Sequence, residues 1–510
     1  MIKVLFFLPS YGKPDRGLSA VGEQEDNRGL RHGCRCRSVA GSHDGGKAHL
    51  RFFTVLRLRS GMEIEMERPH NSIGQEFTVL SLLKFVAPTV VMLVFMSLYQ
   101  MVDGVFVSKF VGENALSALN IVYPIPSIII AVSIMLATGG SAVIARNMGE
   151  GKNREAKENF SFLVLTGAAV GAVIVAAGVL FIEPLIYLLG STPALYDYCY
   201  DYLLILILSA PLAVFQMLFQ SFFVTAGKPH LGLTLTVLGG IANIVLDYVF
   251  IVVCGFGVSG AALATSIGYS IPGLFGLVYF TVNRRGTLYF VKPVLRWRLL
   301  LRCCANGSSE MVNNLAVAVT TFLFNVLMLK YAGEAGVAAI TIVLYAQFLM
   351  TSAFMGFSSG VAPVVSFNYG SRNVRQLKKI FKISVCVVAI VSALVFGIAE
   401  LGSDIVILVF TPAGSEVFAL AKHGFAIFSV SFLFTGMNIF ASALFTAFSN
   451  GKVSAILSFL RTFVFLAVCL LILPLFWGVD GIWTAVPIAE AMAFFVSVYY
   501  LARFKKVYEY

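Results

Sequence analysis

Four polar side chains stand inside long apolar segments in the first half of the chain and could together hold a cation: Asp103, Asn243, Asp247 and Thr265. An ionisable group within a membrane span costs roughly 2.5–3.5 kcal/mol on insertion scales, so its presence needs a partner or a function. Two carboxylates, an amide oxygen and a hydroxyl are hard ligands suited to Na⁺. A carboxylate beside a second one can instead carry H⁺. Both ions are candidates, as is the simpler interpretation that each acid only hydrogen-bonds a neighbouring helix.

The spacing of these residues favours one shared site. Asn243 lies four residues before Asp247, which places both side chains on one face of a helix. With a helical rise of about 1.5 Å per residue, Asp103, Asp247 and Thr265 fall in the same half of a hydrocarbon core about 30 Å thick.

Further candidate residues lie at other positions along the chain. Glu490 and Arg461 fall at comparable depth in neighbouring predicted helices, so we expect a buried ion pair, with a coupling role for Glu490 as the alternative. Glu310 is either an interfacial acid stabilised by the dipole at a helix start or a residue of a substrate cavity. Gln216 and Asn438 could line that cavity, or they could link helices.

Membrane helices are the elements that must position these side chains. Of the 510 residues, 58% are hydrophobic and 12% are charged, and the mean hydropathy is +0.86. A soluble domain carries about 25% charged residues, so the composition excludes a disordered chain and argues against a soluble enzyme. Apolar runs of about 20 residues, enough for one crossing each, recur from residue 79 onwards. They are too long and too uniformly apolar for barrel strands.

We therefore predict an all-α membrane protein with twelve transmembrane helices. They are expected at residues 79–105, 118–140, 160–182, 202–224, 231–253, 258–280, 309–330, 337–360, 381–400, 422–447, 453–476 and 479–502.

The basic residues predict the orientation of these helices. The net charge is +11, and most Lys and Arg lie in loops after even-numbered helices, whereas loops after odd-numbered helices hold only Lys109, Lys330 and Lys422. The positive-inside rule then predicts a multi-pass protein of the cell (inner) membrane with both termini in the cytoplasm. This distribution indicates a lipid bilayer as partner and argues against nucleic acid.

The two halves of the chain repeat at a constant offset of 221 residues. Matching pairs include Gly112 and Gly333, Asn147 and Asn368, Gly149 and Gly370, Phe160 and Phe381, and Thr225 and Thr446. Six helices per half is an even number, so we expect two six-helix lobes related by a pseudo-two-fold axis along the membrane normal, with a cleft between them. The positions equivalent to the four candidate cation ligands are apolar: Phe324, Val464, Val468 and Val486.

The predicted domain organisation follows from this repeat and from composition. Polar, Arg-rich residues at the start of the chain indicate a disordered N-terminal extension with no folded role. The predicted segments are residues 1–70 as this extension, 77–285 as the N-terminal lobe with helices 1–6, 286–308 as a cytoplasmic linker, 309–503 as the C-terminal lobe with helices 7–12, and 504–510 as a cytoplasmic tail.

Enzymatic chemistry is not expected from this sequence. The segment from Gly356 to Gly360 is similar to a hydrolase nucleophile turn, but such a turn needs a general base, and none of the six histidines lies deep in a predicted span. The sequence also lacks a GxxxxGK[ST] phosphate loop. We therefore expect an ion gradient, rather than ATP or another cofactor, to supply the energy.

Three segments resemble motifs of the multidrug and toxic compound extrusion (MATE) transporters. They are Tyr99 to Asp103, Asn243 to Asp247, and Gly260 to Thr265. The resemblance covers about residues 77 to 505 and is strong as a set. It implies twelve helices in two lobes and a Na⁺- or H⁺-driven antiporter that expels organic, often cationic, drugs by alternating access.

The same resemblance implies roles for individual residues. Asp103, Asn243, Asp247 and Thr265 correspond to the cation site of the N-terminal lobe, and Pro88 corresponds to the proline of the first helix. Some branches of the family carry acids deep in helices 7 and 10, whereas this chain carries none in helix 10, and its Glu310 lies near the cytoplasmic start of helix 7.

We therefore predict a multidrug efflux antiporter, of the kind that confers antibiotic resistance, which acts as a monomer on small organic molecules with Na⁺ or H⁺ as coupling ion. The alternative is a flippase for a lipid-linked saccharide precursor on the same two-lobed scaffold. Such a flippase would favour a strongly cationic cavity, and the spans supply little positive charge beyond Arg461. A channel or a non-transporting scaffold would show no coupled exchange.

Overall fold

The computed structural model describes residues 72–111, 118–119, 121–193 and 195–510, without the side chains of residues 101, 103–109 and 318. All described residues belong to one structural unit, Glu67–Tyr510. The expectation of a disordered extension over residues 1–70 lies outside the described residues.

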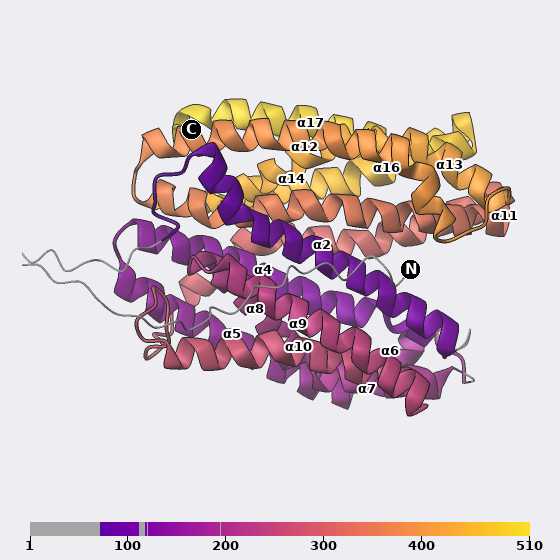
Figure 1. Ribbon diagram of the computed structural model, residues 1–510, viewed down its shortest axis with the longest axis horizontal. Helices are drawn as coiled ribbons and strands as arrows, with labels where there is room; N and C mark the ends of the chain where they lie inside the picture. The colour runs from indigo at the N-terminus through magenta and orange to yellow at the C-terminus, as the bar shows by residue number, and fades with distance from the viewer. Residues whose placement is uncertain (1–71, 112–117, 120, 194) are drawn as a thin grey trace, which may run out of the picture. The chain divides into compact units, whose positions relative to one another are not determined.

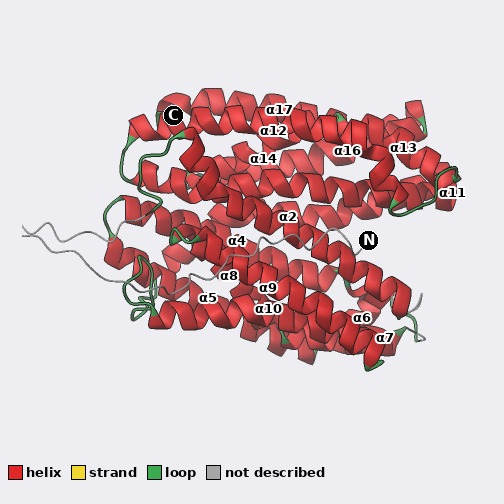
Figure 2. Ribbon diagram, viewed as in Figure 1, coloured by secondary structure: helices red, strands yellow, loops and turns green. Residues whose placement is uncertain are grey.

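Helices build this unit, and the described residues contain no strand (Figure 2). The first half contains α2 (Val79–Phe110), α4 (Pro124–Gly149), α5 (Asn153–Leu180), α6 (Ile182–Leu188), α7 (Tyr196–Leu208), α8 (Ala210–Thr225), α9 (Pro229–Asp247), the π-helical turn η1 (Tyr248–Val253) and α10 (Gly257–Val282). The second half contains α11 (Trp297–Gly370), α12 (Val374–Leu408), α13 (Glu416–Ser429), α14 (Phe432–Ala447), α15 (Gly451–Phe459), the π-helical turn η2 (Leu460–Phe465), α16 (Leu466–Trp477) and α17 (Val479–Tyr508).

The prediction of an all-α membrane protein is confirmed. Within the described ranges, nine helices are long and apolar enough to cross a membrane, or up to eleven if each of two bent pairs counts as one span. The bent pairs are α7 with α8, at 51°, and α13 with α14, at 53°. Helix α11 runs for 74 residues and contains both predicted spans 309–330 and 337–360; it breaks at Gly333, whose φ of 64° is not helical. The number of twelve crossings stays a prediction.

The break between α7 and α8 has a local cause. Pro211 lies in the first turn of α8, where a missing N–H costs nothing because that group has no helical partner. Ser209 occupies the joint, and its Oγ accepts a hydrogen bond from Ser266 Oγ of α10 at 2.9 Å. The bend is therefore anchored to the neighbouring helix.

Helix α11 contacts helices of both halves of the chain. It packs against α2 and α4 of the first half and against α12, α13, α14 and α15 of the second. In Figure 1 the orange-to-yellow helices of the second half lie together above the magenta helices of the first, and α2 follows the boundary between them.

Phenylalanine rings fill the core between α5, α8 and α10. The ring centroid of the fully buried Phe160 is 5.1 Å from that of Phe222 and 4.8 Å from that of Phe280. Such aromatic pairs contribute about 0.5–1.5 kcal/mol each beyond the burial of their area. This packing holds α8 and α10, which both carry candidate site residues.

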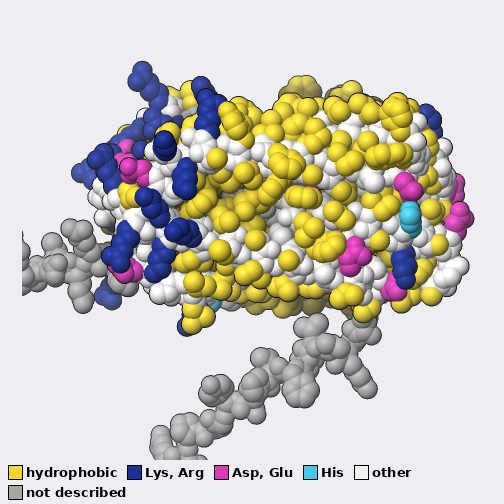
Figure 3. Space-filling view, turned by 90° about the horizontal axis from the view of Figure 1, so that it is seen from above, with side chains coloured by type: hydrophobic (Ala, Val, Ile, Leu, Met, Phe, Trp, Pro, Cys, Tyr) yellow, Lys and Arg dark blue, Asp and Glu magenta, His cyan; other side chains and the backbone are white. Residues whose placement is uncertain are grey.

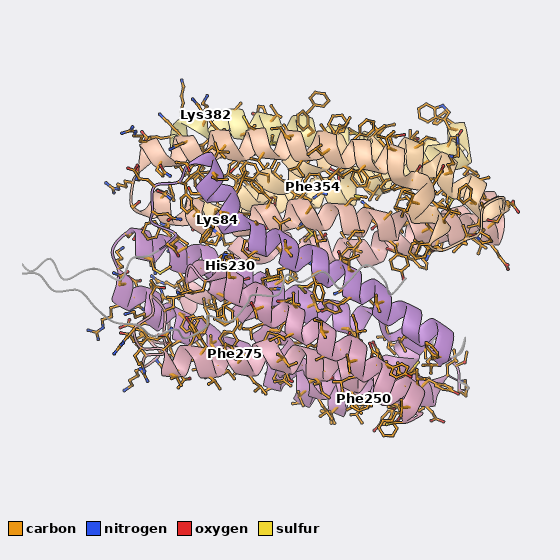
Figure 4. The ribbon with its side chains drawn as sticks, in the orientation of Figure 1. Lys84, His230, Phe250, Phe275, Phe354 and Lys382 are labelled. Carbon is orange, nitrogen blue, oxygen red and sulfur yellow. The ribbon has the colours of Figure 1, made fainter. Side chains whose placement is uncertain are left out.

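Lys and Arg side chains gather at one end of this unit, which carries Lys382 of α12 and is termed here the basic end (Figures 3 and 4). Arg296 joins the start of α11 to the start of α5 by ion pairs with Glu155, at 2.9 Å, and Glu158, at 3.0 Å. A broad apolar belt separates this end from the opposite one (Figure 3). In Figure 4, Lys382 lies toward the basic end and Phe250 of η1 toward the opposite end.

Two glycines allow α4 and α11 to meet backbone to backbone at the basic end. A Cβ on Gly149 would collide with the backbone oxygen of Phe367, and a Cβ on Gly370 would collide with that of Arg146. The two contacts are equivalent: Gly149 and Gly370 are 221 residues apart, and so are Arg146 and Phe367, whose oxygens they meet. The Arg146 guanidinium also stacks over the ring of Tyr369 at 5.1 Å. The two helices are therefore closed against each other at this end.

Gly149→Ala and Gly370→Ala should each destabilise the protein by about 1–3 kcal/mol, because the added methyl group must displace backbone. Thermal unfolding of the detergent-purified protein measures the effect. Gly397→Ala and Gly402→Ala of α12 are the matched controls, since a Cβ at either position meets nothing within 4 Å. Equal melting temperatures for the test and control variants would contradict the close contact.

Candidate functional site

The crossing of α9 and α10 places Asn243 beside Thr265. The two backbones approach at Gly239 and Gly268, where a Cβ on Gly239 would lie 2.8 Å from the Gly268 oxygen. Asn243 and Thr265 each lie about one helical turn from these glycines, on the same side of the crossing. Asn243 Nδ2 donates a long hydrogen bond of 3.5 Å to Thr265 Oγ1. Small residues at the crossing therefore bring these two predicted ligands together.

Asp247 ends α9, one turn beyond Asn243, and is fully buried. The π-helical turn η1 follows it directly. Such turns are rare and frequently occur at functional sites. Asp103 belongs to α2, but its side chain is outside the described residues, so its proximity to Asp247 stays a prediction.

A small cavity of about 10 Å³ lies against Asn243 and Thr265, and Gln216 and Thr236 also line it. Its size suits a single water-sized guest. Asn243 Oδ1 and Gln216 Oε1 are buried and accept no hydrogen bond within the described part of the chain. Amide oxygens in this state are ready ligands for a hard cation such as Na⁺. Asp247 is not among the lining residues of this cavity.

A larger, central cavity of about 280 Å³ opens between α2, α4, α8, α10, α11 and α14. Its walls include Met92, Met96, Met217 and Met355, whose flexible side chains can adapt to ligands of different shape. Glu310 is the one charged side chain among its described lining residues. A flexible apolar wall with a single acid suits an organic cation.

The central cavity approaches one end of the bundle and stops short of the other. Along α4 it extends from Tyr123, an exposed residue at the start of the helix, to Ala142. Ala142 precedes Gly149, where α4 closes against α11, by about two turns. The cavity therefore lies toward the end opposite the basic end.

Tyr99 and Tyr269 line both the small and the central cavity. Tyr99 comes from α2, and Tyr269 comes from α10, four residues after Thr265. Sequence reasoning assigned no role to Tyr269, although its helical spacing from Thr265 was a usable signal. A rearrangement at one cavity can reach the other through these two side chains.

The remaining candidates are distributed over three places. Of the four residues considered for a substrate cavity or for coupling, Glu310 lines the central cavity and Gln216 lines the small one. Asn438 and Glu490 lie against each other in the second half, outside the described lining of both cavities.

Arg461 and Glu490 form the buried ion pair that the sequence predicted. Arg461 Nε donates to Glu490 Oε1 at 2.8 Å, and the two side chains are only 12% and 8% exposed. Asn438 Nδ2 donates to Glu490 Oε2 at 2.7 Å, and Ser497 Oγ donates to Asn438 Oδ1 at 3.0 Å. Pairing and added hydrogen bonds are what a buried ion pair requires to offset its desolvation.

The MatE family model matches residues 88–249 and 311–471, more than half of the chain. The chain belongs to the MatE family. The resemblance noted in the sequence is thereby confirmed, as is the expectation of a transporter rather than an enzyme.

Curated relatives share most of the chain's length. Multidrug export protein MepA of Staphylococcus saprophyticus is 24% identical over 415 residues, which cover 79% of this chain and 91% of the relative. Multidrug export protein MepA of Staphylococcus aureus is 22% identical over 436 residues, which cover 82% of this chain and 93% of the relative.

Solved structures share the fold. An outward-facing multidrug resistance MATE family transporter superimposes with a TM-score of 0.79 at 24% identity, covering 84% of this chain and 96% of that one. A transporter from Pyrococcus furiosus, described as having a binding pocket of reverse polarity that suggests a different function, gives 0.80 at 22% identity, covering 86% and 99%. At identities of 24% and 22%, these structures establish only the fold of this chain. The charge of its central cavity must be taken from its own lining residues.

Glu490→Ala and Arg461→Ala should each destabilise the protein by about 3–5 kcal/mol, because each leaves a buried charge unpaired. The double variant should cost less than the sum of the two, as measured by thermal unfolding in detergent. Asp404→Ala breaks the half-exposed ion pair with Lys422 and is the control, expected within about 1 kcal/mol of the parent. Additive effects of the two buried substitutions would contradict the pairing.

Proposed function

We propose that this protein is a multidrug efflux antiporter that exports organic, often cationic, compounds in exchange for Na⁺ or H⁺. The observation that carries the proposal is the contact between two cavities of different chemistry, which share Tyr99 and Tyr269. The central one suits an adaptable organic guest, and the small one offers amide oxygens to an inorganic cation. The naming of the MepA relatives as multidrug export proteins supports this function.

The proposed topology has twelve crossings in two six-helix lobes, residues 77–285 and 309–503. Helix α11 supplies two crossings and turns at Gly333, while each bent pair supplies one. The reciprocal contacts of Gly149 and Gly370 support a pseudo-two-fold relation between the lobes, since such an axis pairs equivalent positions crosswise. One chain contains both cavities, which supports a monomeric transporter.

The proposed orientation places the basic end on the cytoplasmic side of a cell (inner) membrane, and the proposal also assigns both termini to the cytoplasm. The gathering of Lys and Arg at this end supports it by the positive-inside rule (Figure 3). In this orientation the central cavity lies toward the outside. The contact of α4 with α11 then closes the cytoplasmic side.

In the proposed cycle, binding of the inorganic cation and binding of the organic substrate weaken each other. A cation taken up from outside binds at Asp103, Asn243, Asp247 and Thr265 and draws α2, α9 and α10 together. Tyr99 and Tyr269 move with these helices, which weakens the hold of the central cavity on the substrate. Linkage requires the converse, so bound substrate lowers the affinity for the cation. The lobes then rock to open the cytoplasmic side, where the cation leaves and substrate enters.

The membrane potential can drive such a cycle. For an uncharged substrate, one monovalent cation that enters across about 100 mV releases about 2.3 kcal/mol, enough for roughly a fifty-fold substrate gradient before any concentration term. A one-for-one exchange with a singly charged organic cation moves no net charge, so the concentration gradient of the inorganic ion must drive it.

A flippase for a lipid-linked saccharide precursor has less support. The pyrophosphate of such a substrate needs cationic side chains, whereas the charged residue among the described lining of the central cavity is the acid Glu310.

Asp247→Asn should abolish gradient-driven efflux, because an amide neither takes up a proton nor supplies the charge that holds Na⁺. Counterflow of a fluorescent organic cation in proteoliposomes, under an imposed pH or Na⁺ gradient, measures this. Asp201→Asn, at an exposed acid of α7, is the matched control and should transport normally. Full coupled transport by Asp247→Asn would refute the assignment.

Thr265→Val should raise the Na⁺ concentration for half-maximal transport by about tenfold, because the isosteric change removes one oxygen ligand. The same proteoliposomes, with Na⁺ varied at constant pH, provide the measurement. An unchanged Na⁺ dependence in a variant that still transports would exclude Thr265 as a ligand and favour H⁺.

A further inference from the structure

Two basic side chains converge on one tyrosine ring at the basic end. Lys157 Nζ of α5 lies 4.0 Å from the centre of the Tyr289 ring, and the guanidinium carbon of Arg284 lies 5.8 Å from it. Tyr289 and Arg284 belong to the loop of residues 283–296 that joins α10 to α11 (Figure 1). A helix of the first half and the loop between the halves thus each bring one cation to the same ring.

Packing fixes the position of this loop on α5. The backbone N–H of Val291 donates to Ser161 Oγ at 3.0 Å, and the Phe290 ring centroid lies 5.1 Å from that of Phe160. Arg284 Nη1 donates to the Phe290 oxygen at 2.9 Å, which ties the guanidinium to the loop backbone. The two cations are therefore held near each other by the fold.

Neither Lys157 nor Arg284 forms an ion pair with a carboxylate among the residues that the structure describes. The acids on the same turns of α5, Glu155 and Glu158, are paired with Arg296 at 2.9 and 3.0 Å. Two unpaired cations that face one ring repel each other, so an anion that reaches both would be attracted by two charges at once.

Exposed apolar side chains lie beside these charges. The ion pairs of Arg296 with α5 hold the start of α11 against the same helical turns that carry Lys157. Trp297 and Leu301 follow on α11, one turn apart and thus on one face, and they are 67% and 70% exposed. Tryptophan is typical of the headgroup level of a bilayer. Charge and apolar surface together suit an anionic lipid, which brings both a phosphate and acyl chains.

We propose that the surface formed by Lys157, Arg284, Tyr289, Trp297 and Leu301, termed here the loop surface, binds one anionic glycerophospholipid. The headgroup phosphate contacts Lys157 and Arg284, and the acyl chains pack against Trp297 and Leu301. A zwitterionic lipid binds less tightly because its headgroup carries no net charge. The partner is a lipid of the bilayer and not a transported compound, so the proposal does not depend on what the protein exports.

The three tryptophans of the chain allow a test that distinguishes the two ends of the molecule. Trp483 is fully buried, whereas Trp297 and Trp477 are exposed. Trp477 directly precedes α17, a helix about 45 Å long whose other end carries Lys505 and Lys506. The variant Trp477→Phe therefore leaves Trp297 as the lipid-exposed reporter, and Trp297→Phe leaves Trp477 as the reporter at the opposite end.

The measurement uses phospholipids with dibrominated acyl chains, which quench the fluorescence of a tryptophan that they touch. The full chain is reconstituted into vesicles mixed from phosphatidylglycerol and phosphatidylcholine, with one lipid brominated at a time, and quenching gives their relative affinity. Phosphatidylglycerol should be preferred by about tenfold at Trp297 and not at Trp477. Equal quenching of Trp297 by the two lipids would overturn the proposal.

Charge variants in the Trp477→Phe background test the site itself. Lys157→Gln/Arg284→Gln should reduce the preference at Trp297 to about twofold or less. Lys157→Gln alone, which leaves the bond of Arg284 to the loop backbone intact, should reduce it to about threefold.

Lys378→Gln/Lys379→Gln is the matched control, because it removes two exposed charges of α12 close to Lys382 of the basic end. It should keep the full preference at Trp297. An equal loss in this control, or an undiminished preference in the variants of Lys157 and Arg284, would overturn the proposal, because the charge of the whole end would then attract the lipid.

Discussion

The inability of a bilayer interior to solvate charge determines where the ionisable side chains of this protein lie. Arg461 and Glu490 are buried as a pair at 2.8 Å, with Asn438 completing the hydrogen bonds of the carboxylate. Asp247 is fully buried at the end of α9, directly before a π-helical turn. Such groups persist in a membrane protein only where their charge is compensated, and a transporter can use a compensating cation that enters and leaves.

Close helix crossings bring the buried polar side chains of different helices within reach of each other. Gly239 and Gly268 bring α9 and α10 near enough for Asn243 to reach Thr265. Gly149 makes the corresponding contact between α4 of the first half and α11 of the second and closes the basic end. Small residues thus serve both the proposed ion site and closure, as is common where packing rather than hydrophobicity drives helix association in lipid.

The sequence was most informative about properties that can be read within each helix, namely its hydropathy and the depth of its polar residues. Hydropathy located the helices, and depth arithmetic predicted the pairing of Arg461 with Glu490. The sequence could not place Gln216 beside Asn243, because this contact depends on how the consecutive helices α8 and α9 pack against each other. It also missed the breaks inside the bent pairs, where hydropathy continues unchanged through a bend that only tertiary contacts explain.

The central claim is that an inorganic cation and an organic guest exclude one another within one chain. The most direct test adds a fluorescent organic cation to the purified protein in weakly buffered solution and records the release of H⁺ with a pH dye, or of radioactive Na⁺ from preloaded protein. The account expects one of the two ions to be released as the organic cation binds, and no release from Asp247→Asn. Tight binding of the organic cation to the parent protein with neither ion released would contradict it.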